Sequence, residues 1–391
     1  MILNNPYNFP EAKLSPDFAQ ENLKNFKSLI DTGLSFVVLS MPGVGVSYFL
    51  KYLAMQEFAF FIHVDLYDLP TLSQHEFYKL LLTELDGKPD EKPDEQLLLE
   101  SKKALQALSQ KREKIDVDYF RSTKDGAKIV IIFSRFDQLK AEFDWNFLSN
   151  IQSLTAVSPG KIVLIFTSIK PLHEIAPDAL SGGNLNFYSE KLYFKPYSKN
   201  DLKELLQIEP ARPTPKAVLE KLLELSGGHN QLLHILLSSQ KEQLLLDRFV
   251  QMQMKEFVDY LNYFQRKTLQ KVAQGKNIDE IDEYLLGVGL IKKSGSTYQL
   301  FTPLLSEYVK THLSVKLPAK EAKLFKLLRR NMGSTVTKYE IFQEVWGENN
   351  EEATDWALDA LIYRLRKHPF MKTNNYIIES HKKVGYTLIQ T

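Results

Sequence analysis

The chain has 391 residues, and at about 150 residues per domain it is expected to form two or three domains. With 44% hydrophobic and 25% charged residues it has a globular composition, which excludes a disordered, collagen-like or membrane-spanning chain. The 49 Lys and Arg nearly balance the 48 Asp and Glu, so any affinity for nucleic acid has to come from a local patch. The lack of cysteine excludes disulfides, thiol nucleophiles and Cys-ligated metals. Without a leader-like start or a long apolar run, we expect a cytoplasmic protein that does not contact a membrane.

The first half of the chain alternates short apolar runs with longer segments of helical type. The runs lack polar alternation, as expected for strands buried on both faces of a parallel sheet. A polar, proline-containing stretch at 86–94 precedes a charged helix over 95–114, and we interpret both as an insertion. Five strands are predicted, at residues 36–39, 60–64, 129–133, 162–166 and 192–194.

From residue 199 onward the pattern becomes helical. Two apolar helices separated by Gly227-Gly228 predict a small lid, and two later blocks each combine helices with a hairpin, the plan of a winged-helix domain. The first hairpin is predicted about Ser294-Gly295. The last block is predicted to contain helices at 320–330, 338–345 and 354–367 and a hairpin over 376–389. The predicted domains are an α/β domain at 1–198, a helical lid at 199–243, a winged-helix connector at 244–315 and a second winged helix at 316–391.

A glycine-containing turn follows the first predicted strand and opens a helix. In a phosphate-binding loop, GxxxxGK[ST], glycines let backbone N–H groups face the phosphates, the Lys reaches the β- and γ-phosphates, and the Ser or Thr holds Mg²⁺. Gly43, Gly45 and Ser47 are present, but Ser40 replaces the first glycine and Val46 replaces the lysine. A valine cannot supply the charge that this loop needs.

The end of the third predicted strand carries a second altered motif. In P-loop ATPases this strand ends in acidic residues that hold Mg²⁺ and orient water. Here Ser134 and Arg135 take their places, and only Asp137 remains of the acidic pattern. Losing one transition-state contact costs about 10²–10³ in rate. We therefore expect no efficient hydrolysis and no catalytic residue. We also expect no required cofactor; the alternative is that the module binds ATP or ADP with Mg²⁺.

Residues 10–240 resemble AAA+/STAND-type P-loop ATPases, close to the archaeal and bacterial Orc-like ATPases. Besides both motifs, Thr167 or Ser168 stands where a polar residue contacts the γ-phosphate, and 225–229 resemble the family's lid motif. The resemblance implies ATP binding and nucleotide-driven assembly. Two hypotheses stay open: a fold kept as a scaffold, and a module that binds nucleotide without hydrolysing it. The candidate nucleotide-binding residues are Gly43, Gly45, Val46, Ser47, Asp137 and Thr167.

Near the C-terminus, the segments 322–331, 336–347, 361–367 and 382–386 follow one another in the order and spacing of a known signature. They resemble the OmpR/PhoB-type DNA-binding domain of bacterial response regulators. The resemblance implies that the third helix enters the major groove of DNA and that the wing enters the adjacent minor groove.

Helical periodicity gives the third helix an apolar and a polar side. Leu358, Ile362 and Leu365 recur at core spacing, which leaves a polar side suited to phosphates and base edges. From Leu317 to Thr391 there are 12 Lys and Arg against 9 Asp and Glu, a modest local excess. The predicted DNA contacts are Asp359, Tyr363, Arg364, Arg366, Lys367, Lys382 and Lys383.

Three positions of this helix depart from the family pattern. Trp356, Ala357 and Leu361 stand where the family often carries Arg, Thr and His, and they cannot distinguish guanine from adenine by bidentate hydrogen bonds. The alternative is an exposed apolar strip, including Trp356 and Leu361, that binds a protein.

The segment 277–284 of the connector carries four carboxylates, which would repel phosphates, so we interpret this domain as a packing element. The eight histidines lack ligand spacing, and no metal site is expected.

The sequence therefore predicts an α/β, parallel-sheet P-loop (AAA+-like) core with a helical lid, followed by two winged-helix (α+β) domains. The leading hypothesis is a DNA-binding transcriptional regulator whose P-loop module acts as a scaffold or ligand sensor. Its expected partners are double-stranded DNA and a protein or a second copy bound through the ATPase-like module. The alternatives are a nucleotide-binding signalling or assembly protein and a protein-interaction scaffold without DNA binding.

Overall fold

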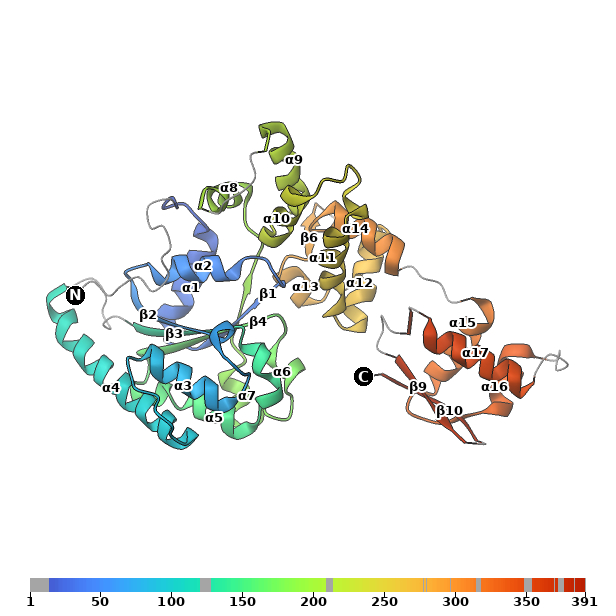
Figure 1. Ribbon diagram of the computed structural model, residues 1–391, viewed down its shortest axis with the longest axis horizontal. Coiled ribbons are helices and arrows are strands. Elements are labelled where there is room, and N and C mark those ends of the chain that lie inside the picture. Colours follow the sequence, from blue (N-terminus) through green and yellow to red (C-terminus); the bar gives the residue numbers. More distant parts are fainter. Residues whose placement is uncertain are drawn as a thin grey trace. The chain divides into compact units, whose positions relative to one another are not determined.

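The computed structural model describes residues 14–119, 128–208, 214–276, 278, 280–295, 297–313, 318–347, 354–368, 370–371, 376–382 and 384–390. The chain divides into two compact units (Figure 1). Unit 1 comprises Met1–Leu244 and Glu283–Leu290, and unit 2 comprises Leu245–Asp282 and Ile291–Thr391. The segment Glu283–Leu290, which lies inside the predicted connector, therefore groups with the α/β unit.

Unit 1 is built on a parallel sheet of five strands in the order β2-β3-β4-β1-β5. All five predicted strands are confirmed: β1 (Phe36–Ser40), β2 (Ala59–Asp65), β3 (Lys128–Ser134), β4 (Ile162–Ser168) and β5 (Lys191–Phe194). Parallel neighbours need crossover connections, so helices cover the faces, and every residue of β1 and β4 is buried. Figure 1 shows α1 (Gln20–Thr32) and α2 (Val46–Ala54) on one side of the sheet.

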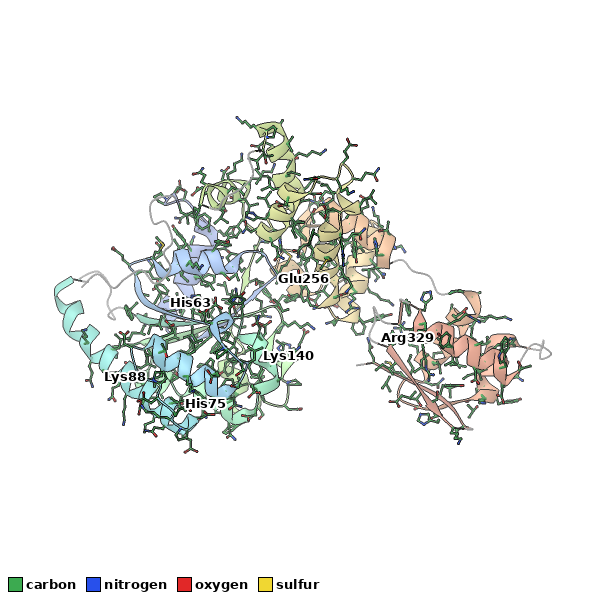
Figure 2. The ribbon with its side chains drawn as sticks, viewed as in Figure 1. His63, His75, Lys88, Lys140, Glu256 and Arg329 are labelled. Carbon is green, nitrogen blue, oxygen red and sulfur yellow. The ribbon has the colours of Figure 1, made fainter. Side chains whose placement is uncertain are left out.

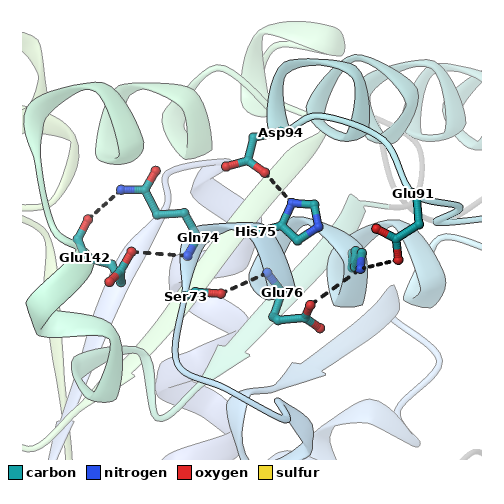
Figure 3. A network of polar contacts seen from close by, with 8 residues as sticks. Ser73, Gln74, His75, Glu76, Glu91, Asp94 and Glu142 are labelled. Carbon is teal, nitrogen blue, oxygen red and sulfur yellow. Dashed lines mark hydrogen bonds and ion pairs between the residues drawn. The ribbon is translucent and has the colours of Figure 1, made fainter.

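The charged helix of the predicted insertion packs against the helix that precedes the insertion. The charged helix is longer than expected: α4 spans Asp94–Tyr119 and packs against α3 (Gln74–Glu84). Figure 3 shows the contacts at their N-terminal ends, where His75 Nδ1 lies 2.6 Å from Asp94 Oδ1 and Gln74 Nε2 donates to the carbonyl of Glu142. The insertion is thus joined to α3, and α3 is joined in turn to the segment that follows β3.

The remaining elements of unit 1 are short helices and the lid. The lid consists of α8 (Lys199–Ile208), α9 (Lys216–Ser226) and α10 (Asn230–Ser238), as the sequence predicted. The other helices are α5 (Trp145–Gln152), α6 (Leu172–Ile175), α7 (Gly183–Phe187) and α13 (Glu283–Gly287), with 3₁₀ turns at Leu66–Asp68, Phe136–Glu142, Thr155–Val157 and Leu244–Leu246.

The first part of unit 2 has helices and the predicted hairpin. Its elements are α11 (Arg248–Asp259), α12 (Tyr263–Ala273), the hairpin of β6 (Ile291–Ser294) and β7 (Thr297–Leu300), α14 (Pro303–Tyr308) and a π-helical turn at Val309–Leu313. Asn262 begins α12 with a reciprocal capping box, its side chain accepting from the N–H of Gln265.

The C-terminal domain is a winged helix with its own core. Its elements are α15 (Ala319–Arg330), β8 (Val336–Thr337), α16 (Lys338–Trp346), α17 (Asp355–Lys367), β9 (Tyr376–His381) and β10 (Gly385–Gln390). The predicted helices and hairpin are confirmed, while the short β8, which completes an antiparallel sheet in the order β8-β10-β9, was not predicted. A Cβ at Gly385 would come within 1.8 Å of the Val336 carbonyl, so only glycine allows β10 to approach β8 so closely.

Among the residues with a described placement, no helix is both long and apolar enough to cross a membrane.

Candidate functional site

The turn between β1 and α2 contains two left-handed glycines and leads directly into a helix. Gly43 and Gly45 have φ of +71° and +103°, left-handed conformations that favour glycine, and Gly45 is the N-cap of α2. Val46 is the first residue of α2 and Ser47 the second, so valine occupies the position from which the motif's lysine would extend. The two glycines of the expected motif thus adopt left-handed conformations, and the position expected for its lysine holds a valine.

The lid holds this turn by its carbonyl oxygens. His229 Nε2 lies 2.8 Å from the Pro42 oxygen, and the Gln231 N–H donates to the Gly43 oxygen at 3.2 Å. The hydroxyl of Tyr197 donates to the Gly45 oxygen at 2.8 Å. A Cβ added to Gly43 would lie only 2.0 Å from Gln231 Oε1, so the lid side chain packs directly on the loop.

His229, which links the lid to the turn, is buried and neutral. Because Nε2 must donate to the Pro42 carbonyl, Nδ1 is the acceptor, and it caps α10 by accepting from the Leu232 N–H. Burial lowers the pKa of His229 to about 4. At neutral pH the imidazole is therefore uncharged and joins the loop to the lid.

The end of β3 carries a hydroxyl and a cation where the resemblance implies two carboxylates. Ser134 Oγ hydrogen-bonds to Nε2 of His63 on β2, which is labelled in Figure 2. Arg135, whose φ of +59° is left-handed, places Nη1 2.9 Å from Asp65 Oδ1, and its guanidinium lies 4.8 Å from the centre of the Tyr67 ring. Burial lowers the pKa of His63 to about 4, so its imidazole is also neutral.

Asp137 and Thr167, two predicted nucleotide contacts, each accept a hydrogen bond from a backbone N–H group. Asp137 Oδ2 accepts from the Ile169 N–H at 3.1 Å, and burial raises the pKa of this carboxyl group. Thr167 Oγ1 accepts from the Arg135 N–H at 2.8 Å. Both side chains thus join the ends of β3 and β4.

Sequence reasoning missed Asp65, His63 and Tyr197 in this region. A signal was available for Asp65, because it ends a buried strand, as Ser134 does, and strand ends of a parallel sheet lie at one edge. Tyr197 gave no such signal, since it lies in a connection before the lid.

In the C-terminal domain, several predicted DNA contacts lie at the surface. On α17, Tyr363 and Lys367 are exposed, with Lys367 Nζ 5.9 Å from the centre of the Tyr363 ring. Lys382 is exposed in the turn between β9 and β10, where the resemblance places the wing. Lys383 lies outside the described residues.

The other predicted contacts are tied to their own domain. Arg364 Nε donates to Glu321 Oε1 at 2.8 Å, and Arg366 donates to the Ile378 carbonyl through Nε and Nη2. Asp359 Oδ1 accepts from the Tyr386 hydroxyl at 2.8 Å. These three side chains fix α17 against α15 and the β9–β10 hairpin.

The expectation of an apolar strip that includes Leu361 is wrong. Leu361 is fully buried with Leu358 and Leu365, because it lies three residues after one and four before the other, on the core side of α17. Trp356 is 81% exposed and does belong to the surface. The apolar exposure of α17 therefore comes from its aromatic residues.

The last two residues of the acidic segment, Glu283 and Tyr284, belong to unit 1 and contact its sheet region. Glu283 pairs with Lys191 at 2.8 Å, and the Tyr284 hydroxyl donates to the Ile169 carbonyl at 2.5 Å. Residues 277 and 279 lie outside the described residues. Across the described part of the chain, no group of three or more His, Asp or Glu is placed to hold a metal ion.

Comparison with known protein families identifies the C-terminal winged-helix domain. Residues 312–388 match the family described as "Transcriptional regulatory protein, C terminal", and the winged-helix fold of this segment confirms the resemblance seen in the sequence. Among the curated proteins, none matches the chain.

Several solved structures are similar to the chain. A Walker-type ATPase of Pyrococcus abyssi has 14% identity over 75% of this chain and 95% of its own, with a TM-score of 0.46. The ORC1 protein of Aeropyrum pernix, solved in complex with DNA, has 10% identity over 97% of this chain and 89% of its own, with a TM-score of 0.40. A STAND protein with a tetratricopeptide repeat sensor from Pyrococcus horikoshii has 15% identity over 94% and 53%, with a TM-score of 0.33.

Proposed function

We propose that the protein is a DNA-binding transcriptional regulator that contacts duplex DNA through α17 and the wing of its C-terminal domain. The observation that carries this proposal is the exposed polar side of α17, ending in Lys367, on a domain that matches transcriptional regulators over 312–388. Lys382 adds a second exposed cation in the wing. A recognition helix and a basic wing turn are the two elements with which such a domain contacts a groove and the neighbouring backbone.

A salt titration of DNA binding by the full chain tests this proposal. Each phosphate contact that is lost lowers the slope of log affinity against log salt by about 0.9. We expect Lys367→Ala and Lys382→Ala each to weaken binding to any duplex and to reduce the slope, with the double variant reducing it by about twice as much. Lys326→Ala, an exposed lysine of α15, is the charge-matched control and is expected to change neither quantity. A slope near zero for the unmodified chain, or an unchanged slope in the double variant, would contradict the proposal.

For unit 1 we infer a scaffold or ligand-sensing role without efficient ATP hydrolysis. Val46 supplies no charge to phosphates, Arg135 places a cation at the end of β3, and Asp137 is used by the Ile169 N–H. These residues do not fit a magnesium nucleotide held as in P-loop ATPases, which need a lysine and acidic ligands. Association with a protein partner or a second copy through this module belongs to the same proposal.

A second candidate, a nucleotide-controlled assembly protein, is favoured by one observation. The left-handed Gly43 and Gly45 still place backbone N–H groups at the start of α2, a helix end that attracts anions. Thermal stability measured with and without nucleotide distinguishes this candidate from the scaffold role.

A further inference from the structure

The solvent-facing side of α17 is defined by four residues, which we refer to as the α17 face: Trp356, Asp359, Tyr363 and Lys367. They recur at intervals of three or four residues, so they lie on one side of the helix, opposite the buried leucines. All four are exposed, Trp356 by 81% and Tyr363 by 63%. The centre of the face is thus aromatic, with one carboxylate and a lysine at its C-terminal end.

The two arginines of α17 lie beside this face and are held there. Arg364 pairs with Glu321, a carboxylate that is itself nearly buried. Arg366 uses Nε and Nη2 on the Ile378 carbonyl and Nη2 also on Ser380 Oγ at 2.7 Å. A bidentate guanidinium is the usual group for the O6 and N7 acceptors of guanine. On this helix each guanidinium therefore already has at least one donor engaged within its own domain, Nε for Arg364 and both Nε and Nη2 for Arg366.

Asp359 is positioned by a defined hydrogen bond. The Tyr386 hydroxyl donates to its Oδ1, and burial together with this carboxylate raises the pKa of Tyr386 to about 12, so the phenol remains a donor. The second carboxylate oxygen can accept a further hydrogen bond, and in the major groove the donors are the amino groups of cytosine N4 and adenine N6. The C5 methyl of thymine is the apolar group of that groove, and it suits an aromatic side chain.

We propose that the α17 face recognises thymine-rich duplex DNA, with Trp356 and Tyr363 on thymine methyl groups and Asp359 accepting from the amino group of a neighbouring adenine or cytosine. Guanine is not read directly. Lys367 and the wing supply sequence-independent phosphate contacts. This inference rests on the proposed DNA-binding function and names the class of site that it takes.

Base substitution in a selected duplex tests the inference. The full chain first selects its preferred site from a random pool of duplex DNA, and the thymines of that site are then replaced by deoxyuridine, which lacks only the methyl group. We expect affinity to fall about fourfold for each methyl that loses an apolar contact. Replacing the guanines by 7-deazaguanine, which removes the N7 acceptor, is expected to leave affinity unchanged.

Variants of the protein separate this inference from the proposed function. Trp356→Ala is expected to keep only the preference for thymine over uracil that Tyr363 supplies, so its discrimination falls by about fourfold, while Lys367→Ala weakens binding to both duplexes by the same factor and lowers the salt slope. Since Trp356 is exposed, an unchanged melting temperature confirms that its variant folds. If binding is salt-dependent but insensitive to uracil, or is lost with 7-deazaguanine, the inference is overturned and the proposed function stands. If the chain binds no duplex, or if the α17 face captures a protein instead, both fail.

Discussion

The turn between β1 and α2 and the exposed side of α17 both lack charged side chains that the corresponding family patterns carry, but the consequences differ. At the turn, the surrounding groups have closed in: the lid binds its carbonyls, and Arg135 is paired with Asp65. On α17 the apolar replacement Trp356 remains in solvent. The polar groups of the turn are satisfied by neighbouring residues, whereas the exposed aromatic side chain of α17 is left accessible to a partner. This difference supports the scaffold role proposed for unit 1 and the specificity proposed for α17.

The largest expected effect concerns the two apolar residues that the sequence placed together on α17. Leu361→Ala should destabilise the C-terminal domain by about 2–5 kcal/mol, because it leaves a cavity in a core where Leu361 is fully buried. Trp356→Ala should change stability by less than about 0.5 kcal/mol, since the indole is mostly in solvent. Urea unfolding of both variants measures the difference. Equal costs for the two substitutions would show that the buried and exposed sides of α17 are wrongly assigned.

The next effect concerns the pH dependence of unit 1. The folded pKa values of His63 and His229 are about 4, below the ordinary 6.5, so between these pH values the unfolded chain binds more protons. The contribution of these two neutral histidines to the free energy of unfolding is fully present above pH 6.5 and is lost as the pH falls toward 4. As the pH falls through that range, we expect each histidine to lower the free energy of unfolding by about 1.4 kcal/mol for each pH unit. Urea unfolding at about pH 7, 6 and 5 measures the slope of the free energy of unfolding against pH.

A substitution at His229 isolates its share of that slope. Asn is also a good helix N-cap, so His229→Asn keeps an acceptor for α10 while removing the titrating ring. Its unfolding free energy should depend less on pH than that of the unmodified chain by about one proton. The exposed His173→Asn is the control. An unchanged slope in His229→Asn would contradict a buried, neutral imidazole between the loop and the lid.

The smallest expected effect is the absence of a response to nucleotide. A ligand at 100 times its Kd would add about 2.7 kcal/mol to stability, but we expect millimolar ATP with Mg²⁺ to leave the melting temperature where Mg²⁺ alone leaves it. Gln231→Ala removes the side chain that packs on Gly43 and should give the same result if the missing charge at Val46 is the cause. Stabilisation of the unmodified chain would favour the nucleotide-controlled candidate. Stabilisation only of Gln231→Ala would assign the effect to the lid.

The sequence predicted most elements because each is specified locally. The apolar runs of the parallel strands and the helical period of 354–367 depend on near neighbours alone. The same period predicts a buried Leu361, three residues after Leu358 and four before Leu365, whereas its place in the family pattern suggested an exposed residue. The contact of His229 with Pro42 could not be foreseen, since 187 positions separate the two residues. Likewise, the Asp65–Arg135 pair depends on β2 lying beside β3, which only the strand order reveals.

The return of Glu283–Leu290 to unit 1 has a consequence for synthesis on the ribosome. The chain leaves unit 1 at Leu244, and the last piece of that unit emerges only after residues Leu245–Asp282 of unit 2 have been made. Domains usually fold as they emerge, the N-terminal one first. Here the α/β unit has to wait for α13, whose Tyr284 and Leu285 are buried in it. A nascent chain stopped near residue 244 would therefore expose an apolar surface to chaperones, and one long enough for Glu283–Leu290 to have left the ribosome would not.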